Sequence, residues 1–357
     1  MEQTGQESAR EAGLHYATDR EKGYTRTGKA PRFGYVDAAG KRVRDRATLK
    51  RIRGLVLPPA WTSVWIAADP LAHLQATGRD ARGRKQYRYH HKFRQVREAT
   101  KFDRLPEFAA ALPAIRRSVK RDMHAPPLSR ERVLATVVQL LERTLIRVGN
   151  DEYARANKSY GLTTLRNRHV DVRGARVVFT FRAKSGVQQR IELDDLQLAR
   201  SVRRCQDLPG QMLFQYLDDN GEAKTVDSSD VNEYLHRHFT AKDFRTWAGT
   251  VFAARALADL APTPSPTATK REMVKAIDQV AKRLGNTRAV CRKYYVHPVL
   301  IEAYMEGFVL PAAVANEHNL PRDAARPAGL RRDEIAVVEV LRTRLSQRSS
   351  QQTRPRR

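Results

Sequence analysis

The chain has 357 residues and a formal net charge of +27 at pH 7, because 66 Lys and Arg residues stand against 39 Asp and Glu residues. That length allows two domains, and a positive excess of this size indicates a polyanionic partner, with nucleic acid as the first candidate. The sequence has neither an apolar run long enough to span a bilayer nor the apolar segment of a signal peptide, so we expect a cytoplasmic, nucleoid-associated protein without membrane contact. Two cysteines, Cys205 and Cys291, are too few for a disulfide framework or a cysteine zinc site.

The first part of the chain is predicted to be β-rich. Residues 1–22 are polar and lack apolar periodicity, so we expect a flexible N-terminus, followed by a β-rich domain over residues 23–97. In chain order, the patterns predict a hairpin over 32–43 with its turn at 37–40, a short helix over 45–54 capped by Asp45, and strands at 58–69, 71–80 and 85–90.

A larger, mainly helical domain is predicted over residues 98–321, followed by a basic, partly disordered tail over 322–357. We expect a helix over 106–123 that breaks at Pro113, and a helix that begins after Ser129 and carries an apolar stripe. The further predictions are three short strands within 169–193, a strand pair turning at 218–221, helices from Ser229 onward, a Pro-Thr-rich loop over 261–269 and one helix near 333–345. The fold class is therefore α+β, with a β-rich N-terminal domain and a mainly α-helical C-terminal domain that holds a small three-stranded sheet.

The segment between Arg79 and Arg104 concentrates positive charge, with ten Lys or Arg residues and three acidic residues, interleaved with tyrosines. Cations bind phosphates regardless of sequence, Gln can read adenine, and Tyr can stack or contact the sugar-phosphate backbone. The alternative is a solvated edge strand whose tyrosines cover a core. The candidate DNA-binding residues are Arg84, Lys85, Gln86, Tyr87 and Tyr89.

The sequence lacks the patterns of common phosphate chemistry. Its ten histidines include no HExxH pair, and no GxxxxGK[ST] loop is present, so neither a metal site nor ATP hydrolysis is predicted. A reaction on a phosphodiester would then need a protein nucleophile and several fixed cations, for which planar, permanently charged Arg is well suited. The candidate catalytic residues are Arg147, Lys184, Arg245, Asn286 and Tyr295.

Each candidate also has an ordinary structural interpretation when it is taken alone. Arg147 could interact with a helix C-terminus, Lys184 could be an exposed turn residue, and Asn286 could end a helix. Arg245 could pair with a neighbouring acid, and Tyr295 could be a core residue.

The order of these residues resembles that of the type IB DNA topoisomerases, in particular the poxvirus-like branch found in bacteria. In the first domain the resemblance rests on "LPPAWTSVWI" and "HLQATGRDARGRKQYRYH". In the second domain it rests on "IRVGNDEYARANKSYGLTTLRNRHV", "FRAKSG", "KDFRTWAGT" and "LGNTRAVCRKYYVHP". The resemblance covers about residues 25–320 and implies the catalytic fold that these enzymes share with tyrosine recombinases.

The resemblance implies a role for each matching position. Tyr295 corresponds to the nucleophile that takes the 3′-phosphate of one strand, and Lys184 to the general acid that protonates the departing 5′-oxygen. Arg147 and Arg245 correspond to clamps on the scissile phosphate. Asn286 stands where poxvirus enzymes and recombinases usually carry His; it can donate a hydrogen bond but cannot carry a full charge.

The resemblance also implies how such an enzyme works as a whole. A clamp of both domains closes on double-stranded DNA, one strand is cut and rotates, and religation restores it, so neither ATP nor another cofactor is required. We expect a monomer, and we expect Mg²⁺ to be at most a stimulant of turnover. The family spacing selects Tyr295 over Tyr294, and neighbouring helical residues differ by about 100° in direction, so both rings cannot point at one phosphate.

Two other functions are compatible with parts of the sequence. A tyrosine site-specific recombinase would share the Arg-Lys-Arg-Tyr series, but such enzymes usually carry HxxR where this chain has Lys242 and Arg245. A non-catalytic basic DNA-binding protein would satisfy the composition alone.

Overall fold

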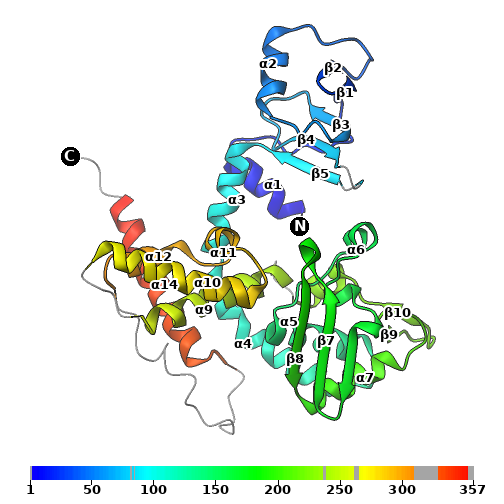
Figure 1. Cartoon of the computed structure of the whole chain (residues 1–357), viewed down its shortest axis with the longest axis vertical. Coiled ribbons are helices and arrows are strands. Elements are labelled where there is room, and N and C mark those ends of the chain that lie inside the picture. Colours follow the sequence, from blue (N-terminus) through cyan, green and yellow to red (C-terminus); the bar gives the residue numbers. More distant parts are fainter. Residues whose placement is uncertain are drawn as a thin grey trace. The chain divides into compact units, whose positions relative to one another are not determined.

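The chain forms two compact units, Met1–Asp103 and Arg104–Arg357, in a computed structural model (Figure 1). The structure describes all residues except 1, 81–82, 84, 236–238, 261–264, 309–328 and 353–357. The division falls later than the predicted domain end at residue 97. Helix α3 (His91–Asp103) belongs to the first unit, because Phe93 on this helix is buried against Ala9 and Leu14.

The first unit is built on a five-stranded antiparallel sheet with the strand order β2–β1–β3–β4–β5. Its strands are β1 (Gly23–Lys29), β2 (Arg32–Val36), β3 (Thr62–Ala67), β4 (Leu74–Arg79) and β5 (Lys85–Tyr89), and its second helix is α2 (Arg46–Gly54). Ile52 of α2 packs with Val64, Ile66 and Ala76 of the sheet to form the core. The three predicted strands are confirmed, as is the Asp45 cap, whose carboxylate accepts a 2.7 Å bond from the Thr48 backbone. The predicted turn at 37–40 is present, but the main partner of β2 is β1, for which no strand was predicted.

The prediction of a flexible N-terminus over residues 1–22 is wrong. Residues Glu2–Glu11 form helix α1, with Ala9 and Leu14 packed against Phe93. Further along, Ala17 packs against Ala67 and Ala72 of the sheet region. The apolar residues of this segment are too few and too small to produce a periodic pattern, yet each meets an apolar partner that lies far away in the sequence.

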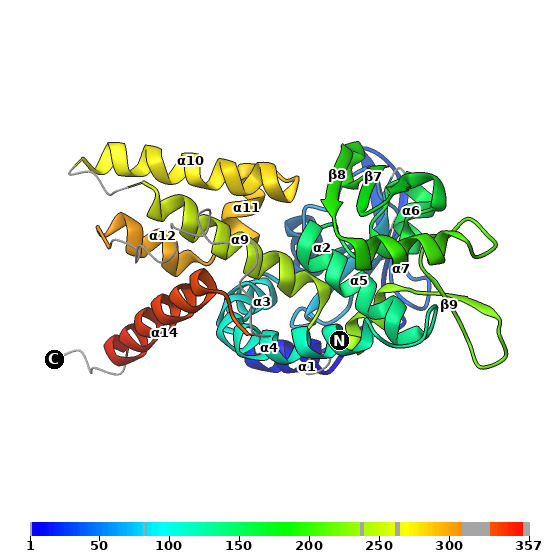
Figure 2. The same cartoon turned by 90° about the horizontal axis from the view of Figure 1, so that it is seen from below.

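The second unit combines a small antiparallel sheet, in the order β6–β7–β8, with a set of helices. Its elements before the sheet are α4 (Leu105–Asp122), α5 (Arg130–Thr144) and α6 (Asp151–Asn157). The sheet and the elements after it are β6 (Val170–Arg173), β7 (Arg176–Arg182), β8 (Gln188–Asp194), α7 (Leu196–Gln206), β9 (Gln215–Leu217), β10 (Ala223–Thr225) and α8 (Ser228–Leu235). The remaining helices are α9 (Ala241–Ala258), α10 (Pro266–Leu284), α11 (Arg288–Tyr294), α12 (Pro298–Met305) and α14 (Arg332–Gln352). Helices α9, α10 and α12 lie side by side (Figure 2).

Most local predictions for this unit are confirmed, and two are corrected. Ser129 caps α5, and the three strands with their turns lie where the pattern places them. Helix α4, however, runs through Pro113 without a break. Proline removes a single backbone donor, and the buried Phe108 and Leu112 hold the helix against its neighbours. In the predicted loop 261–269, the part from Pro266 onward is the first turn of α10, where the fixed φ of proline suits the first helical position; residues 261–264 lie outside the described part.

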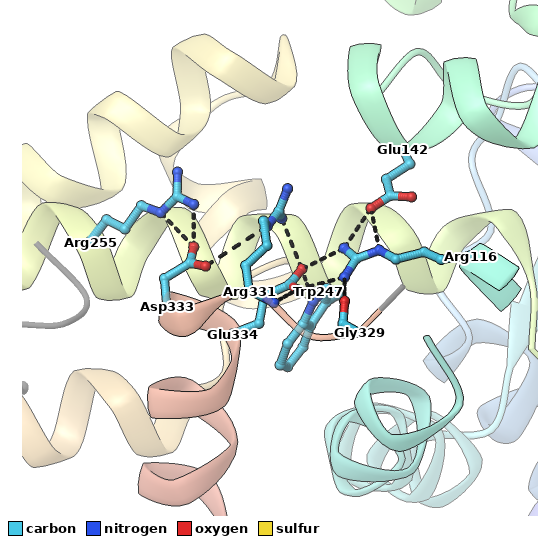
Figure 3. Close-up of polar contacts among 8 residues, drawn as sticks. All are labelled: Arg116, Glu142, Trp247, Arg255, Gly329, Arg331, Asp333 and Glu334. Atoms are coloured by element: carbon cyan, nitrogen blue, oxygen red, sulfur yellow. Dashed lines mark hydrogen bonds and ion pairs between the residues drawn. The ribbon is translucent and has the colours of Figure 1, made fainter. Parts of the chain in front are cut away.

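The segment predicted as a basic tail is part of the second unit. Helix α14 buries an apolar face and, at its start, two carboxylates that have no solvent exposure, Asp333 and Glu334. Figure 3 shows how arginines from other helices hold these groups. Arg116 of α4 donates to Glu334 at 2.8 and 2.9 Å and also bonds Glu142 of α5, while Arg255 of α9 donates to Asp333 at 2.6 Å. The prediction of a helix near 333–345 is confirmed, and the prediction of a partly disordered tail is wrong for its described residues up to Gln352.

Candidate active site

Arg245 is the most deeply buried of the predicted catalytic residues, with 5% of its surface exposed. From α9, its guanidinium donates to the backbone carbonyl of Leu145 and, at 2.7 Å, to that of Leu284. Leu145 ends α5 in a left-handed conformation with φ 57°, and Leu284 is the last residue of α10. Carbonyls at helix C-termini lack partners within the helix, so two helix ends together fix one buried cation.

Arg147 and Asn286 meet each other, although they lie 139 residues apart in the sequence. Arg147 donates to the Asn286 side-chain oxygen at 2.7 Å. Since arginine can only donate, this bond fixes the amide orientation and turns the Asn286 nitrogen away from Arg147. That nitrogen, Nδ2, is buried without a hydrogen-bond partner among the described residues, and the same holds for Nε of Arg245.

These two unsatisfied buried N–H donors, one on the Asn286 amide and one on the Arg245 guanidinium itself, indicate a place for an anion. Burying an unpaired donor costs about 1–3 kcal/mol, so an acceptor that binds to it recovers this free energy. Burial, and then the positive charge of Arg147, lower the pKa of Arg245, while the neighbouring Tyr295 side chain acts in the opposite direction. An incoming anion would relieve the repulsion between the two guanidinium groups.

Tyr295 lies directly beside this anion site. The Arg245 guanidinium lies 5.4 Å from the centre of the Tyr295 ring, which is half-buried. Tyr295 follows the end of α11, and its carbonyl accepts a 3.4 Å bond from the Thr250 hydroxyl of α9. Tyr294 is 36% exposed, and the Lys293 ammonium group lies 5.2 Å from the centre of its ring.

Lys184 lies at the tip of the hairpin between β7 and β8, and its side chain is exposed. A small cavity of about 20 Å³ joins the hairpin to the anion site, because Ala183 lines it together with Arg147 and Arg245. The structure thus brings Arg147, Arg245, Asn286 and Tyr295 together, and it places Lys184 one residue from the wall of the same cavity.

Sequence reasoning missed several groups of this site. The carbonyls of Leu145 and Leu284 carry no signal in the sequence, since any residue could supply them. Gln189 of β8 and Arg283 of α10 also line the small cavity. No pattern indicated Gln189, whereas Arg283 could have been noticed as a cation next to the "LGN" segment.

The predicted DNA-binding residues of the first unit differ in their accessibility. Tyr87 is 49% exposed, and the Lys85 ammonium lies 5.6 Å from its ring centre while it also pairs with Asp19 at 2.6 Å. The Gln86 amide donates to Asp80 at 2.9 Å. Arg84 lies outside the described residues.

Tyr89 occupies a more protected place than Tyr87. Its ring packs against the cluster of Ala9, Leu14 and Phe93, and burial raises the pKa of its hydroxyl. The two tyrosine rings stack with their centres 6.0 Å apart. Of the two, Tyr87 therefore offers the more accessible surface.

Other kinds of site find no support in the described residues. Both cysteines are buried, and burial raises the pKa of Cys205 to about 12 and that of Cys291 to about 11, so neither is a thiolate at neutral pH. Across the described residues, no group of His, Cys, Asp and Glu is arranged to hold a metal ion. In that same part of the chain, every helix is too short or too polar to cross a membrane.

Comparisons with known proteins show which family the sequence matches. The sequence model of the family described as "Eukaryotic DNA topoisomerase I, catalytic core" matches residues 90–308, and that of "Bacterial DNA topoisomerase IB, N-terminal domain" matches residues 32–80. The DNA topoisomerase 1B of Acanthamoeba polyphaga mimivirus is 35% identical over 269 residues, which cover 72% of this chain and 80% of the relative. The DNA topoisomerase 1B of Vaccinia virus (strain Copenhagen) is 22% identical over 241 residues, covering 66% and 73% respectively.

The first match spans more than half of the chain and includes every element that carries a predicted catalytic residue. The arginines, the amide and the tyrosine that the fold gathers come from segments inside that match. This chain belongs to the type IB DNA topoisomerase family and is a DNA topoisomerase of the isomerase class.

Proposed function

We propose that this chain relaxes supercoiled double-stranded DNA with Tyr295 as its nucleophile. One observation carries the proposal: the Tyr295 ring lies next to the buried Arg245 guanidinium, beside two N–H donors that have no partner among the described residues. A phosphate oxygen is the acceptor that such donors suit best.

In the proposed reaction, one ester linkage replaces another. The Tyr295 oxygen attacks the scissile phosphorus and releases its proton to solvent, an O–P bond forms to the tyrosine, and the bond from phosphorus to the 5′-oxygen breaks. The product is a 3′-phosphotyrosyl linkage, and the free 5′-hydroxyl end can rotate about the intact strand. Attack of that hydroxyl on the linkage reverses the step, so the exchange needs no ATP.

Arg147, Arg245 and Asn286 are proposed to bind the non-bridging oxygens of the scissile phosphate. A donor that points at developing negative charge in a water-poor site accelerates the chemical step by a factor of about 10²–10³. Asn286 is neutral, so we assign it the lower end of that range.

Lys184 is proposed as the general acid that gives a proton to the departing 5′-oxygen. An exposed position on a hairpin tip suits this role, because the ammonium group can reach a leaving group that moves away from the phosphorus. Ser185 and Gly186, with φ of 66° and 79°, form the tight turn that presents Lys184.

The first unit is proposed to contribute a DNA-binding face around Tyr87. The exposed ring and the neighbouring Lys85 are suited to contact with the backbone and base edges of a duplex. We further propose that the enzyme acts as a monomer on nucleoid DNA, since a charge of +27 favours binding to polyanions of any sequence. Sedimentation as a dimer at working concentrations would contradict the monomer.

Magnesium is proposed to stimulate turnover without taking part in the chemistry. Divalent cations compete with Lys and Arg for phosphates and so speed the release of product DNA. Relaxation rates that are equal with Mg²⁺ and with a chelator would contradict this stimulation.

The decisive experiment traps the covalent intermediate. A labelled duplex whose cleaved fragment dissociates is incubated with the enzyme, and the linked peptide is mapped after denaturing electrophoresis. Tyr295→Phe should abolish the adduct and plasmid relaxation while it retains DNA binding, whereas Tyr294→Phe should keep both activities. An adduct on another residue, or relaxation by Tyr295→Phe, would overturn the assignment.

A further inference from the structure

Arg283 lines the small cavity of about 20 Å³ together with Arg147 and Arg245. It lies in the last turn of α10, and it also lines a second cavity of about 230 Å³ beside α9. Arg283 is not among the catalytic residues predicted from the sequence, and it has no role in the proposed reaction.

The guanidinium of Arg283 is held by an aromatic ring instead of by an acid. It lies 4.5 Å from the centre of the Phe252 ring of α9, and Arg255 approaches the same ring at 5.8 Å. Arg255 is neutralised by Asp333, whereas Arg283 forms neither an ion pair nor a hydrogen bond with any residue that the structure describes. Burial, and then the charge of Arg255, lower the pKa of Arg283.

This arrangement leaves the charge of Arg283 accessible beside the small cavity. The Arg283 residue is exposed, so its charge is accessible to an incoming anion, and the charge of Arg255 nearby adds to the attraction. Stacking on Phe252 restricts the side chain in advance, so less entropy is lost when an anion binds. The geometry therefore favours contact with a substrate anion.

The end of α10 links this cation to the rest of the site. Leu284 supplies the carbonyl that holds Arg245, and Asn286 supplies the amide oxygen that holds Arg147. Three arginines thus converge on one short segment. The segment itself contributes a neutral amide at position 286, so the site has one cation fewer than it would have with a charged imidazole there.

We propose that Arg283 is a further catalytic residue, which contacts a non-bridging oxygen of the scissile phosphate and supplies the positive charge that neutral Asn286 does not. This inference rests on the proposed function. Arg283 transfers no proton: it stabilises the charge that develops on the phosphate oxygens while the Tyr295 O–P bond forms and the bond to the 5′-oxygen breaks.

The test measures the single-turnover rate of cleavage of a labelled duplex at saturating enzyme, and separately the DNA dissociation constant in a Tyr295→Phe background. Arg283→Gln should lower the cleavage rate about 100-fold, as the loss of one charge-stabilising donor typically does. Its dissociation constant should change far less than its rate. Arg283→Lys should retain part of the rate, and Lys282→Gln, which removes an exposed charge from the same turn, should cleave at the normal rate.

A second arm tests the link to Asn286. In the Arg283→Gln background, Asn286→His should restore cleavage in part below the usual imidazole pKa of about 6.5, where the ring is charged, and not at pH 8. Circular dichroism checks that each variant is folded. If Arg283→Gln does not fold, the comparison of Arg283→Lys with the parent enzyme provides the test.

Three outcomes would overturn the inference. They are normal cleavage by Arg283→Gln at saturation, a loss confined to the dissociation constant, and an equal loss in Lys282→Gln. A failure of the proposed function looks different, because Tyr295→Phe would then still form the covalent adduct. If Tyr295→Phe forms no adduct and Arg283→Gln cleaves normally, the role of Arg283 is contradicted and the proposed function is not.

Discussion

Gly249 allows the closest approach of α9 to the nucleophile, and its substitution by alanine tests the geometry of the site. A glycine in a helix interior costs about 1 kcal/mol relative to alanine, so its presence in α9 needs a reason. A Cβ atom at position 249 would lie 2.5 Å from the carbonyl oxygen of Tyr295, 3.0 Å from its Cβ and 3.2 Å from Cδ1 of Leu284. The first two are atoms of the nucleophile's own residue.

The expected effect of Gly249→Ala follows from these distances. An ordinary contact of a Cβ atom is 3.4–4 Å, so the Tyr295 backbone has to retreat by about 1 Å. A misplacement of about 1 Å at a reacting group can cost about 10²-fold in rate. Alanine gains about 1 kcal/mol in helix propensity, whereas overpacking costs about 1–3 kcal/mol, so the free energy of unfolding should fall slightly or stay level.

The assay is single-turnover cleavage by Gly249→Ala, with the melting temperature measured in parallel. Gly54→Ala is the matched control, because a Cβ atom at that helix position meets nothing within 4 Å. The control should cleave normally and should be as stable as the parent or more so. A Gly249→Ala enzyme that is more stable and cleaves at the parental rate would refute the close approach.

Three further predictions concern other parts of the molecule. Glu334→Gln should destabilise the second unit by about 3–5 kcal/mol, because it leaves Arg116 with an incomplete buried partner set, whereas exposed Glu339→Gln should change little in thermal unfolding. Burial alone would raise the pKa of Glu334, but the hydrogen bond from Arg116 and the charges of Arg331 and Arg116 outweigh it and lower the pKa. The stabilisation by the Glu334 carboxylate is therefore present at neutral pH and is lost as the pH falls through the pKa of the folded state. Glu334→Gln should flatten this loss of stability at acidic pH. Lys184→Ala should slow cleavage by about 10²–10⁴-fold. A substrate with sulfur in place of the 5′-oxygen should restore most of the cleavage rate of this variant, because a thiolate leaves without a proton. If the rate does not recover, the general-acid role is contradicted. Tyr87→Ala should lower duplex affinity in a filter-binding assay at unchanged melting temperature, and the reverse result would make its ring a structural one.

Much of this protein could be predicted from local sequence alone. The caps at Asp45 and Ser129 and the hairpin turns are set by short-range chemistry, which any fold would have to respect. The spacing of Arg147, Lys184, Arg245 and Tyr295 indicated the family, since these residue types are required by the reaction wherever the chain places them.

Other features depend on contacts between distant residues, which leave no periodic pattern. Helix α1 packs through Ala9 against Phe93 of α3. Helix α14 is held by Glu334, whose partner Arg116 lies 218 residues away, and by Asp333, whose partner Arg255 lies 78 residues away. Helix α4 continues through Pro113 because its neighbours bury the residues around the proline.

The same distinction between local sequence and tertiary contacts applies to the features of the site. The sequence by itself determined which residue types are available for an attack on phosphate, because reactivity resides in the side chains. Only the tertiary structure decided that the ring of Tyr295 lies beside Arg245, that the Asn286 amide turns its nitrogen away from Arg147, and that Arg283 has no acidic partner among the described residues. Orientation and unmatched charge arise when separate helices pack together, and no segment of the chain carries that information alone.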